Sequence, residues 1–233
     1  MRSRIRGLAR AVPLLLAAAA CAQPATPSAT PRATIVFEYT RPGLSVPHFV
    51  LTLTEDGSGT YAAEVAPAPV RGYPAAADAE PTPVRRSLSV SAPAVAAIFA
   101  SARSLDLFHV ECASPAKNIA DSGAKKLTYT GPDGTGSCAY NYSELKPVVA
   151  MTTQFLAIAA TLDEGRALDF KHRFDRLGLD AEIASLARQS GEGQAVELLN
   201  IKPTLEAIAS DHALLERVRL AAAKLLERAG AGK

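Results

Sequence analysis

Apolar and polar residues alternate near the start of the chain in the period-two pattern of half-buried β-strands. The alternation covers residues 34–40 and 46–54, and the dipeptide Asp56-Gly57 supplies a tight turn before a partner strand at 59–65. Ile35, Phe37 and Tyr39 share one face of the first strand. In the second, Phe49, Leu51 and Leu53 share one face, and Val46, His48, Val50, Thr52 and Thr54 share the other. These segments predict an antiparallel hairpin beside a further strand.

A loop, a strand and a helix are expected next. Residues 66–83 are rich in Pro and Ala without periodicity and predict a long surface loop, whereas residues 85–90 predict a strand. Ser91 is expected to cap a helix with Pro93 in its first turn. The apolar stripe of that helix consists of Val95, Ile98, Phe99 and Ala102. Residues 105–112 then predict an extended segment.

A second hairpin is predicted by turn residues. Residues 125–130 and 137–142 flank a segment, 131–136, that contains three Gly, one Pro and one Asp. We therefore expect two paired strands, joined by a longer loop than the one in the first hairpin.

The remainder of the chain has helical periodicity. Residues 145–162 repeat apolar positions at i, i+3 and i+4, and Thr161-Leu162-Asp163-Glu164 matches a capping box that would begin a new helix. Gly178 is expected to end that helix, whose apolar side would consist of Phe170, Phe174 and Leu177. Shorter helices are expected at 180–189, with Ile183 and Leu186 inward, and at 212–229.

Strands followed by helices predict an α+β fold: an N-terminal antiparallel sheet with one packed helix, then an all-helical C-terminal region. The expected division of the chain is a signal peptide at 1–20, a Pro/Ala/Thr-rich tether at 21–33, a sheet region at 34–143 and a helical region at 144–230. Whether the helical region is a separate domain or covers the sheet is left open.

The N-terminus has the three parts of an export signal. Residues 1–10 carry four Arg and no acid, residues 11–20 are apolar and uncharged, and small residues precede Cys21. The apolar run is about half the ~20 residues that a spanning helix needs. We therefore expect export rather than a permanent membrane span.

Cys21 is the expected site of lipidation. The run Ala18-Ala19-Ala20-Cys21 resembles the lipobox of bacterial lipoproteins, in which the Cys becomes the first mature residue and carries the lipid. Ala18 stands where that box usually has Leu. Ordinary cleavage after an Ala-x-Ala segment, giving a freely secreted protein, is the alternative.

Charge and cysteine count agree with export. Without residues 1–20, Lys and Arg fall from 25 to 21 against 23 Asp and Glu, so the net charge changes from +2 to −2. A chain of this charge gives no indication of a basic surface that would bind nucleic acid. With Cys21 as the anchor, Cys112 and Cys138 remain as one pair. We expect a disulfide between them in an oxidising compartment, stabilising the fold by roughly 3 kcal/mol.

Candidate chemistry is sparse. His109 and Glu111 would share one face of a strand, and His48 on another strand could complete a three-ligand zinc set, although chance accounts for such a set more simply. His172 lies among charges of both signs on a predicted solvated helix face, where Asp169 with Arg173 and Lys171 with Asp175 are spaced i, i+4. The sequence has no P-loop, dinucleotide-binding, nucleophile-elbow or His-Glu-x-x-His motif, so no cofactor is expected.

Residues 125–143 and 160–182 resemble a group of uncharacterised bacterial exported proteins. The resemblance covers about a third of the chain and implies an envelope location. It brings no activity, substrate or catalytic residue that could be carried over to this chain. The leading hypothesis is therefore a non-enzymatic envelope lipoprotein, held at the membrane by its N-terminal lipid, with an interaction or structural role and an unknown protein partner. The alternatives are a secreted metal-assisted enzyme using His48, His109 and Glu111, and a ligand- or peptide-binding module using a sheet edge or the 66–83 loop.

Overall fold

An antiparallel sheet comes first in the chain and helices follow it, which confirms the predicted α+β class. The computed structural model describes residues 32–67 and 79–231. The strands are β1 (Thr34–Thr40), β2 (His48–Thr54), β3 (Ser58–Val65), β4 (Thr82–Ser89), β5 (Ala124–Gly131) and β6 (Gly134–Tyr140). The helices are α1 (Ala92–Ser104), α2 (Lys146–Phe174), α3 (Leu179–Gly191), α4 (Lys202–Ser210) and α5 (Glu216–Ala231), with single 3-10 turns η1 (Asp106–Phe108) and η2 (Leu198–Ile201).

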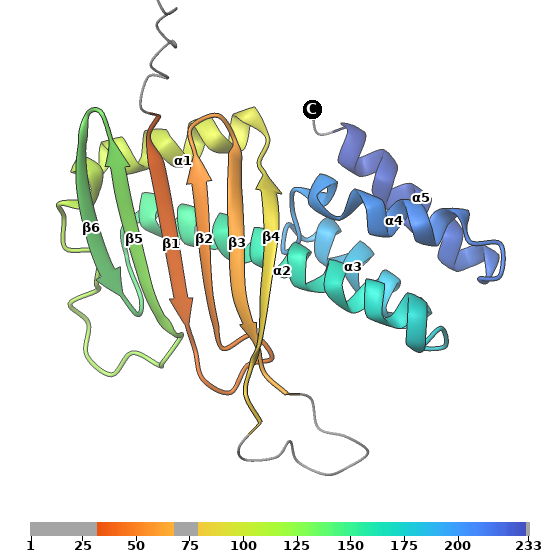
Figure 1. Ribbon diagram of the computed structural model, residues 1–233. Coiled ribbons are helices and arrows are strands. Elements are labelled where there is room, and N and C mark those ends of the chain that lie inside the picture. Colours follow the sequence, from red (N-terminus) through yellow and green to blue (C-terminus); the bar gives the residue numbers. More distant parts are fainter. Residues whose placement is uncertain (1–31, 68–78, 232–233) are drawn as a thin grey trace, which may run out of the picture. The chain divides into compact units, whose positions relative to one another are not determined.

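The six strands form one sheet in the order β4-β3-β2-β1-β5-β6, and every neighbouring pair is antiparallel (Figure 1). Both predicted hairpins are present. The loop between β5 and β6 is the shorter one, however, because Gly131 pairs with Gly134 and only Pro132 and Asp133 lie between them. The prediction of a longer second loop is wrong, since all three of its glycines, Gly131, Gly134 and Gly136, belong to the ladder.

One face of the sheet is covered by α1 and α2, which both lie behind the strands in Figure 1. The alternation read from the sequence places the expected side chains inward, and Phe37 stacks on Phe155 of α2 with ring centroids 5.1 Å apart. The opposite face has half-buried or exposed side chains with many hydroxyls. They include Thr34, Thr52, Thr54, Thr60, Thr128, Thr130 and Ser137. A sheet covered on one side only accounts for the clean period of two.

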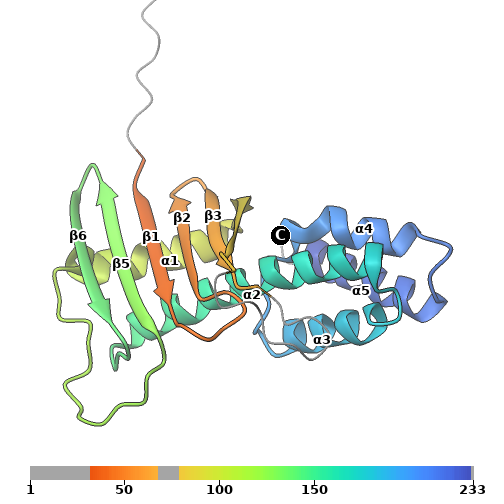
Figure 2. The ribbon, with the colours of Figure 1, turned by 60° about the horizontal axis from the view of Figure 1, so that its bottom comes forward.

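Helix α2 is shared by two apolar cores. Its first half contributes Met151, Phe155 and Ile158 to the core beneath the sheet. Leu168, farther along, belongs to a second core among the C-terminal helices. Figure 2 shows α2 leaving the sheet and continuing beside α3, α4 and α5. Gly165 lies between the two cores, where a Cβ would come within 2.3 Å of Ile201, so only glycine permits this approach of α2 to η2.

The predicted start of a new helix at residues 161–164 is wrong, because α2 is continuous through this point. Thr161 is buried, and its hydroxyl lies 2.7 Å from the Val196 carbonyl and 3.1 Å from that of Ala157. The hydroxyl thus joins α2 to the segment before η2 instead of capping a helix. Gly178 does not end α2 either, since the helix ends at Phe174 and Gly178 stands at the N-cap of α3 with φ −75°.

The predicted extended segment at 105–112 is also wrong. Asp106, Leu107 and Phe108 have φ values of 48°, 54° and 73°, so the chain makes a left-handed turn directly after α1. The turn buries Phe108 completely and brings Leu107 against β6. Burial of these apolar side chains by a reversal of the chain, rather than by alternation, explains the failure of the period-two pattern.

Two smaller predictions change in detail. Ser91 occupies the N-cap position of α1, but its hydroxyl donates to Glu197 and makes no bond to the helix. Strand β4 begins at Thr82, inside the predicted 66–83 loop, and Pro83 is tolerated there because β4 is an edge strand. Residues 68–78 of that loop lie outside the described residues. Among the residues that are described, no helix combines the length and the apolar composition needed to span a bilayer.

Candidate functional site

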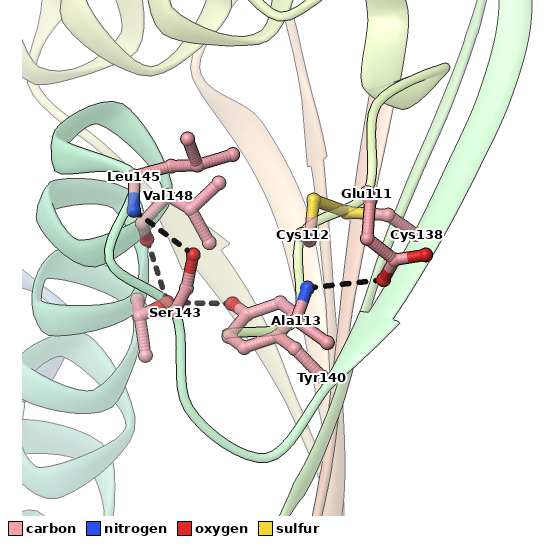
Figure 3. The surroundings of a disulfide bond; sticks show 9 residues. Glu111, Cys112, Ala113, Cys138, Tyr140, Ser143, Leu145 and Val148 are labelled. Atoms are coloured by element: carbon pink, nitrogen blue, oxygen red, sulfur yellow. Dashed lines mark hydrogen bonds between the residues drawn. A yellow bond between two sulfur atoms is a disulfide. The ribbon is translucent and has the colours of Figure 1, made fainter. Parts of the chain in front are cut away.

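A disulfide joins Cys112, in the loop after η1, to Cys138 on β6 (Figure 3). Both cysteines belong to the core beneath the sheet, with exposed fractions of 0% and 9%. The structure thus joins the two cysteines that the count leaves as a pair, although Cys112 lies in a loop and not on the expected strand. The bond holds the irregular segment after α1 against the edge of the sheet.

The suggested zinc ligands are not brought together. His48 on β2 lies 2.9 Å from the Thr40 hydroxyl, whereas His109 lies beside Gly136 on β6. Three strand spacings and five residues along a strand separate these places, which amounts to roughly 20 Å. Glu111 instead accepts a hydrogen bond from the Ala113 N–H at 3.2 Å. Within the part of the chain that the structure describes, no three His, Cys, Asp or Glu side chains are grouped to hold a metal ion.

Three large apolar side chains are exposed where α2 turns into α3. Phe170, Phe174 and Leu177 have exposed fractions of 57%, 73% and 96%, and the two rings lie 5.3 Å apart. We call this group the α2–α3 tip. The sequence places these residues on the apolar side of one helix, but Leu177 lies beyond the end of α2. Leu168 faces the second core, and Phe170, two residues later, is rotated by about 200° around the helix.

The tip is held in place by polar contacts on two sides. Lys171 donates to Glu182 of α3, and His172 Nε2 lies 2.9 Å from the Asp211 carboxylate in the turn between α4 and α5. Arg176 reaches Asp211 as well, at 3.3 Å. The hydrogen bond with His172 is the main reason why the pKa of Asp211 is below its usual value. These contacts replace the i, i+4 pairs expected along the helix, because α2 has charged neighbours on both sides.

The turn itself is ordered by a local bond. Asp175 Oδ1 accepts a hydrogen bond from the Gly178 N–H at 3.0 Å. Arg173 is exposed and forms no ion pair with any described residue, and the side chain of Arg176 is 53% exposed despite its contact with Asp211. The tip is therefore an apolar protrusion whose rim carries charges of both signs: the exposed Arg173, the exposed Asp175 and the Arg176–Asp211 pair.

A pair of carboxyl groups lies between α2 and α3 near this end. Burial, followed by the hydrogen bond with Glu182, raises the pKa of Glu164 to about 7. Burial is the largest single influence on Glu182 and raises its pKa, but the hydrogen bonds with Lys171 and Glu164 and the positive charge of Lys171 together outweigh it and keep the pKa of Glu182 below its usual value. Glu164 Oε1 accepts from Gln189 at 2.6 Å, whereas Oε2 is buried and has no donor. A proton on Glu164 removes a charge that burial disfavours and gives this pair of carboxyl groups a donor that two carboxylates lack.

One edge of the sheet is partly closed to strand addition. The side-chain amide of Asn200 bonds both the N–H and the C=O of Ser89 on β4, at 2.8 and 2.9 Å. On the other edge, the Leu107 carbonyl lies so close to Gly136 of β6 that a Cβ there would approach it to 2.1 Å. The Asn200 contact occupies backbone groups of Ser89 that a strand added to β4 would need. Leu107 lies instead against a face of β6, because a Cβ projects from the face of a sheet and not from its edge.

A cavity of about 580 Å³ lies between the start of α1 and η2. Most of its lining is Ala, Val, Leu and Pro. Its central polar groups bond each other, because the Ser91 N–H and hydroxyl both donate to the Glu197 carboxylate, at 3.0 and 2.7 Å. Glu197 adopts a left-handed conformation to do this, with φ 56°. The arrangement joins η2 to the start of α1 and leaves neither of these two groups free to orient a ligand.

The predicted signal peptide and Cys21 lie outside the described residues. Neither a family model nor a curated protein matches the chain.

Proposed function

We propose that the protein is an exported lipoprotein of the bacterial envelope, anchored through Cys21, whose folded body is a non-enzymatic interaction module. The observation that carries the proposal is the pairing of cysteines. The chain has three, and the structure joins Cys112 to Cys138 inside the core. Cys21 is the one that remains, directly after the apolar run of the export signal.

The buried disulfide supports an oxidising compartment. Disulfides form and persist outside the cytosol, and bridging residues 26 apart stabilises the folded state by roughly 3 kcal/mol in the chain-entropy model. A body that depends on such a bond would be weakened in a reducing cytosol. Export and disulfide formation therefore support each other, and Cys21 remains available for lipidation.

The α2–α3 tip supports the interaction role. The rings of Phe170 and Phe174 together expose roughly 250 Å², and Leu177 brings the apolar area to the order of 400 Å². Patches of this size on monomeric proteins are often functional. The polar contacts of Lys171 and His172 hold the patch rigid, as a binding surface requires.

Fractionation of a bacterial host that expresses the full chain tests the anchor. The wild-type protein should remain with washed membranes, and Cys21→Ser should appear in the soluble envelope fraction. Cys112→Ser is the matched control, because it removes a cysteine without removing the anchor, and it should remain with the membranes. Equal retention of the wild type and Cys21→Ser after washing would contradict lipid anchoring, and a soluble wild type would support free secretion instead.

A further inference from the structure

We propose that the α2–α3 tip is a membrane-contact site, at which Phe170, Phe174 and Leu177 enter the interfacial layer of the bilayer to which the chain is tethered. The inference rests on the proposed function, since the tether supplies the membrane. It names a lipid surface, rather than a protein, as the partner of the tip.

The shape and size of the tip favour a lipid surface. The three side chains project from the end of a helix and the following turn, and Leu177 is 96% exposed. A standard protein interface buries about 800 Å² on each partner, about twice the apolar area at the tip. Insertion into an interfacial layer needs no complementary pocket and no larger area, because the lipid adapts to a protruding group.

One cation at the tip is available to an anionic headgroup. Arg173 is exposed, forms no ion pair with a described residue and lies next to Phe174, so its long side chain can extend toward a phosphate while the ring is immersed. The charge of Arg176 is shared with Asp211, and the exposed Asp175 adds a carboxylate to the same turn. The chain after residue 20 has a net charge of −2. The headgroup contact of the tip is therefore limited to Arg173, and the three apolar side chains carry the interaction with the bilayer.

The segment between Cys21 and Arg32 limits how far the body can lie from its proposed anchor. Cys21 and Arg32, the first described residue, are eleven positions apart, so the segment spans at most about 35–40 Å when extended. This length keeps the body within about one domain diameter of the bilayer. A second, weaker contact selects the face of the body that is turned to the membrane.

The absence of tryptophan from the sequence allows a direct test. Phe174→Trp places the protein's only indole at the tip and preserves an aromatic side chain. Tyr142→Trp is the matched control: Tyr142 is 47% exposed and lies just before the opposite end of α2. The exported protein is purified from its host, its mass is determined, and it is added to vesicles of phosphatidylethanolamine and phosphatidylglycerol, with and without brominated acyl chains.

We expect the emission of Phe174→Trp to shift to the blue and to be quenched by brominated lipid, with neither change for Tyr142→Trp. Adding Leu177→Ser should weaken vesicle binding of unlipidated protein about tenfold, which corresponds to the loss of one buried leucine. An unshifted, unquenched Phe174→Trp on vesicles would overturn the inference, as would a tip-dependent protein complex in place of lipid contact. The mass reports separately on the lipid at Cys21, so failure of the anchor and failure of the tip are distinguishable.

Discussion

Glu164→Gln should remove a pH dependence from the stability of the folded body. In the folded state the pKa of Glu164 is raised to about 7 from an ordinary value of 4.5, chiefly by burial. A raised pKa means that the folded state favours the protonated carboxyl. The stabilisation is therefore fully present below pH 4.5 and is lost as the pH rises through 7.

The size of the effect follows from this shift. A difference of about 2.5 pKa units corresponds to at most about 3.4 kcal/mol. Because the side chain is only partly buried and water screens it, we expect about 1–2 kcal/mol between pH 5 and pH 8. Gln is isosteric with the protonated acid and donates to Glu182 at every pH, so the variant should be the more stable protein at pH 8.

Urea unfolding at a series of pH values measures this directly. The wild type should lose about 1–2 kcal/mol of unfolding free energy from pH 5 to pH 8 relative to Glu164→Gln. Taking the difference cancels the titration of the four histidines. Glu192→Gln, at an exposed position after α3, is the matched control and should follow the wild type. A difference between the wild type and Glu164→Gln that stays constant across this range would refute the shared proton.

Four further variants test the packing and the polar contacts. Replacing Cys112 and Cys138 together by Ser should lower the unfolding free energy in urea by roughly 3 kcal/mol, and an unchanged midpoint would contradict a structural disulfide. Phe155→Ala should lower the free energy of unfolding by about 3–5 kcal/mol because the ring of Phe155 is fully buried. Phe174 is 73% exposed, so Phe174→Ala should lower it by less than about 1 kcal/mol. Equal losses would mean that the tip is packed against the body. The buried Nζ of Lys125 donates to three carbonyl oxygens, and Lys125→Met leaves them without a donor. Thermal melting should therefore show a loss of about 2–3 kcal/mol in the free energy of unfolding, and a neutral result would show that those bonds contribute little.

The strands were predictable because one face of the sheet is covered and the other faces solvent. Ile35, Phe37 and Tyr39 are buried, and the residues between them are not, so the period of two is visible in a single sequence. The irregular path at Asp106–Phe108 has no such pattern. It depends on the contact of Leu107 with β6, which is remote in sequence.

The tip was the hardest feature to predict. Phe170, Phe174 and Leu177 have the spacing of a core-facing helical stripe, and periodicity indicates that residues share a face without indicating what covers it. The charges of Lys171, His172 and Arg173 between the two rings were the available signal, because they leave only a narrow apolar stripe. The disulfide, by contrast, followed from a count of three cysteines and one anchor position.

The central claim is that the chain is exported, trimmed at Cys21, lipidated there and oxidised between its other two cysteines. The intact mass of protein taken from the membrane fraction, measured before and after reduction, tests all of these steps together. The account predicts a chain that begins at Cys21, carries the added mass of its lipid and gains two hydrogens when the disulfide is reduced. A chain that still begins at Met1, with no lipid and an unchanged mass on reduction, would contradict it.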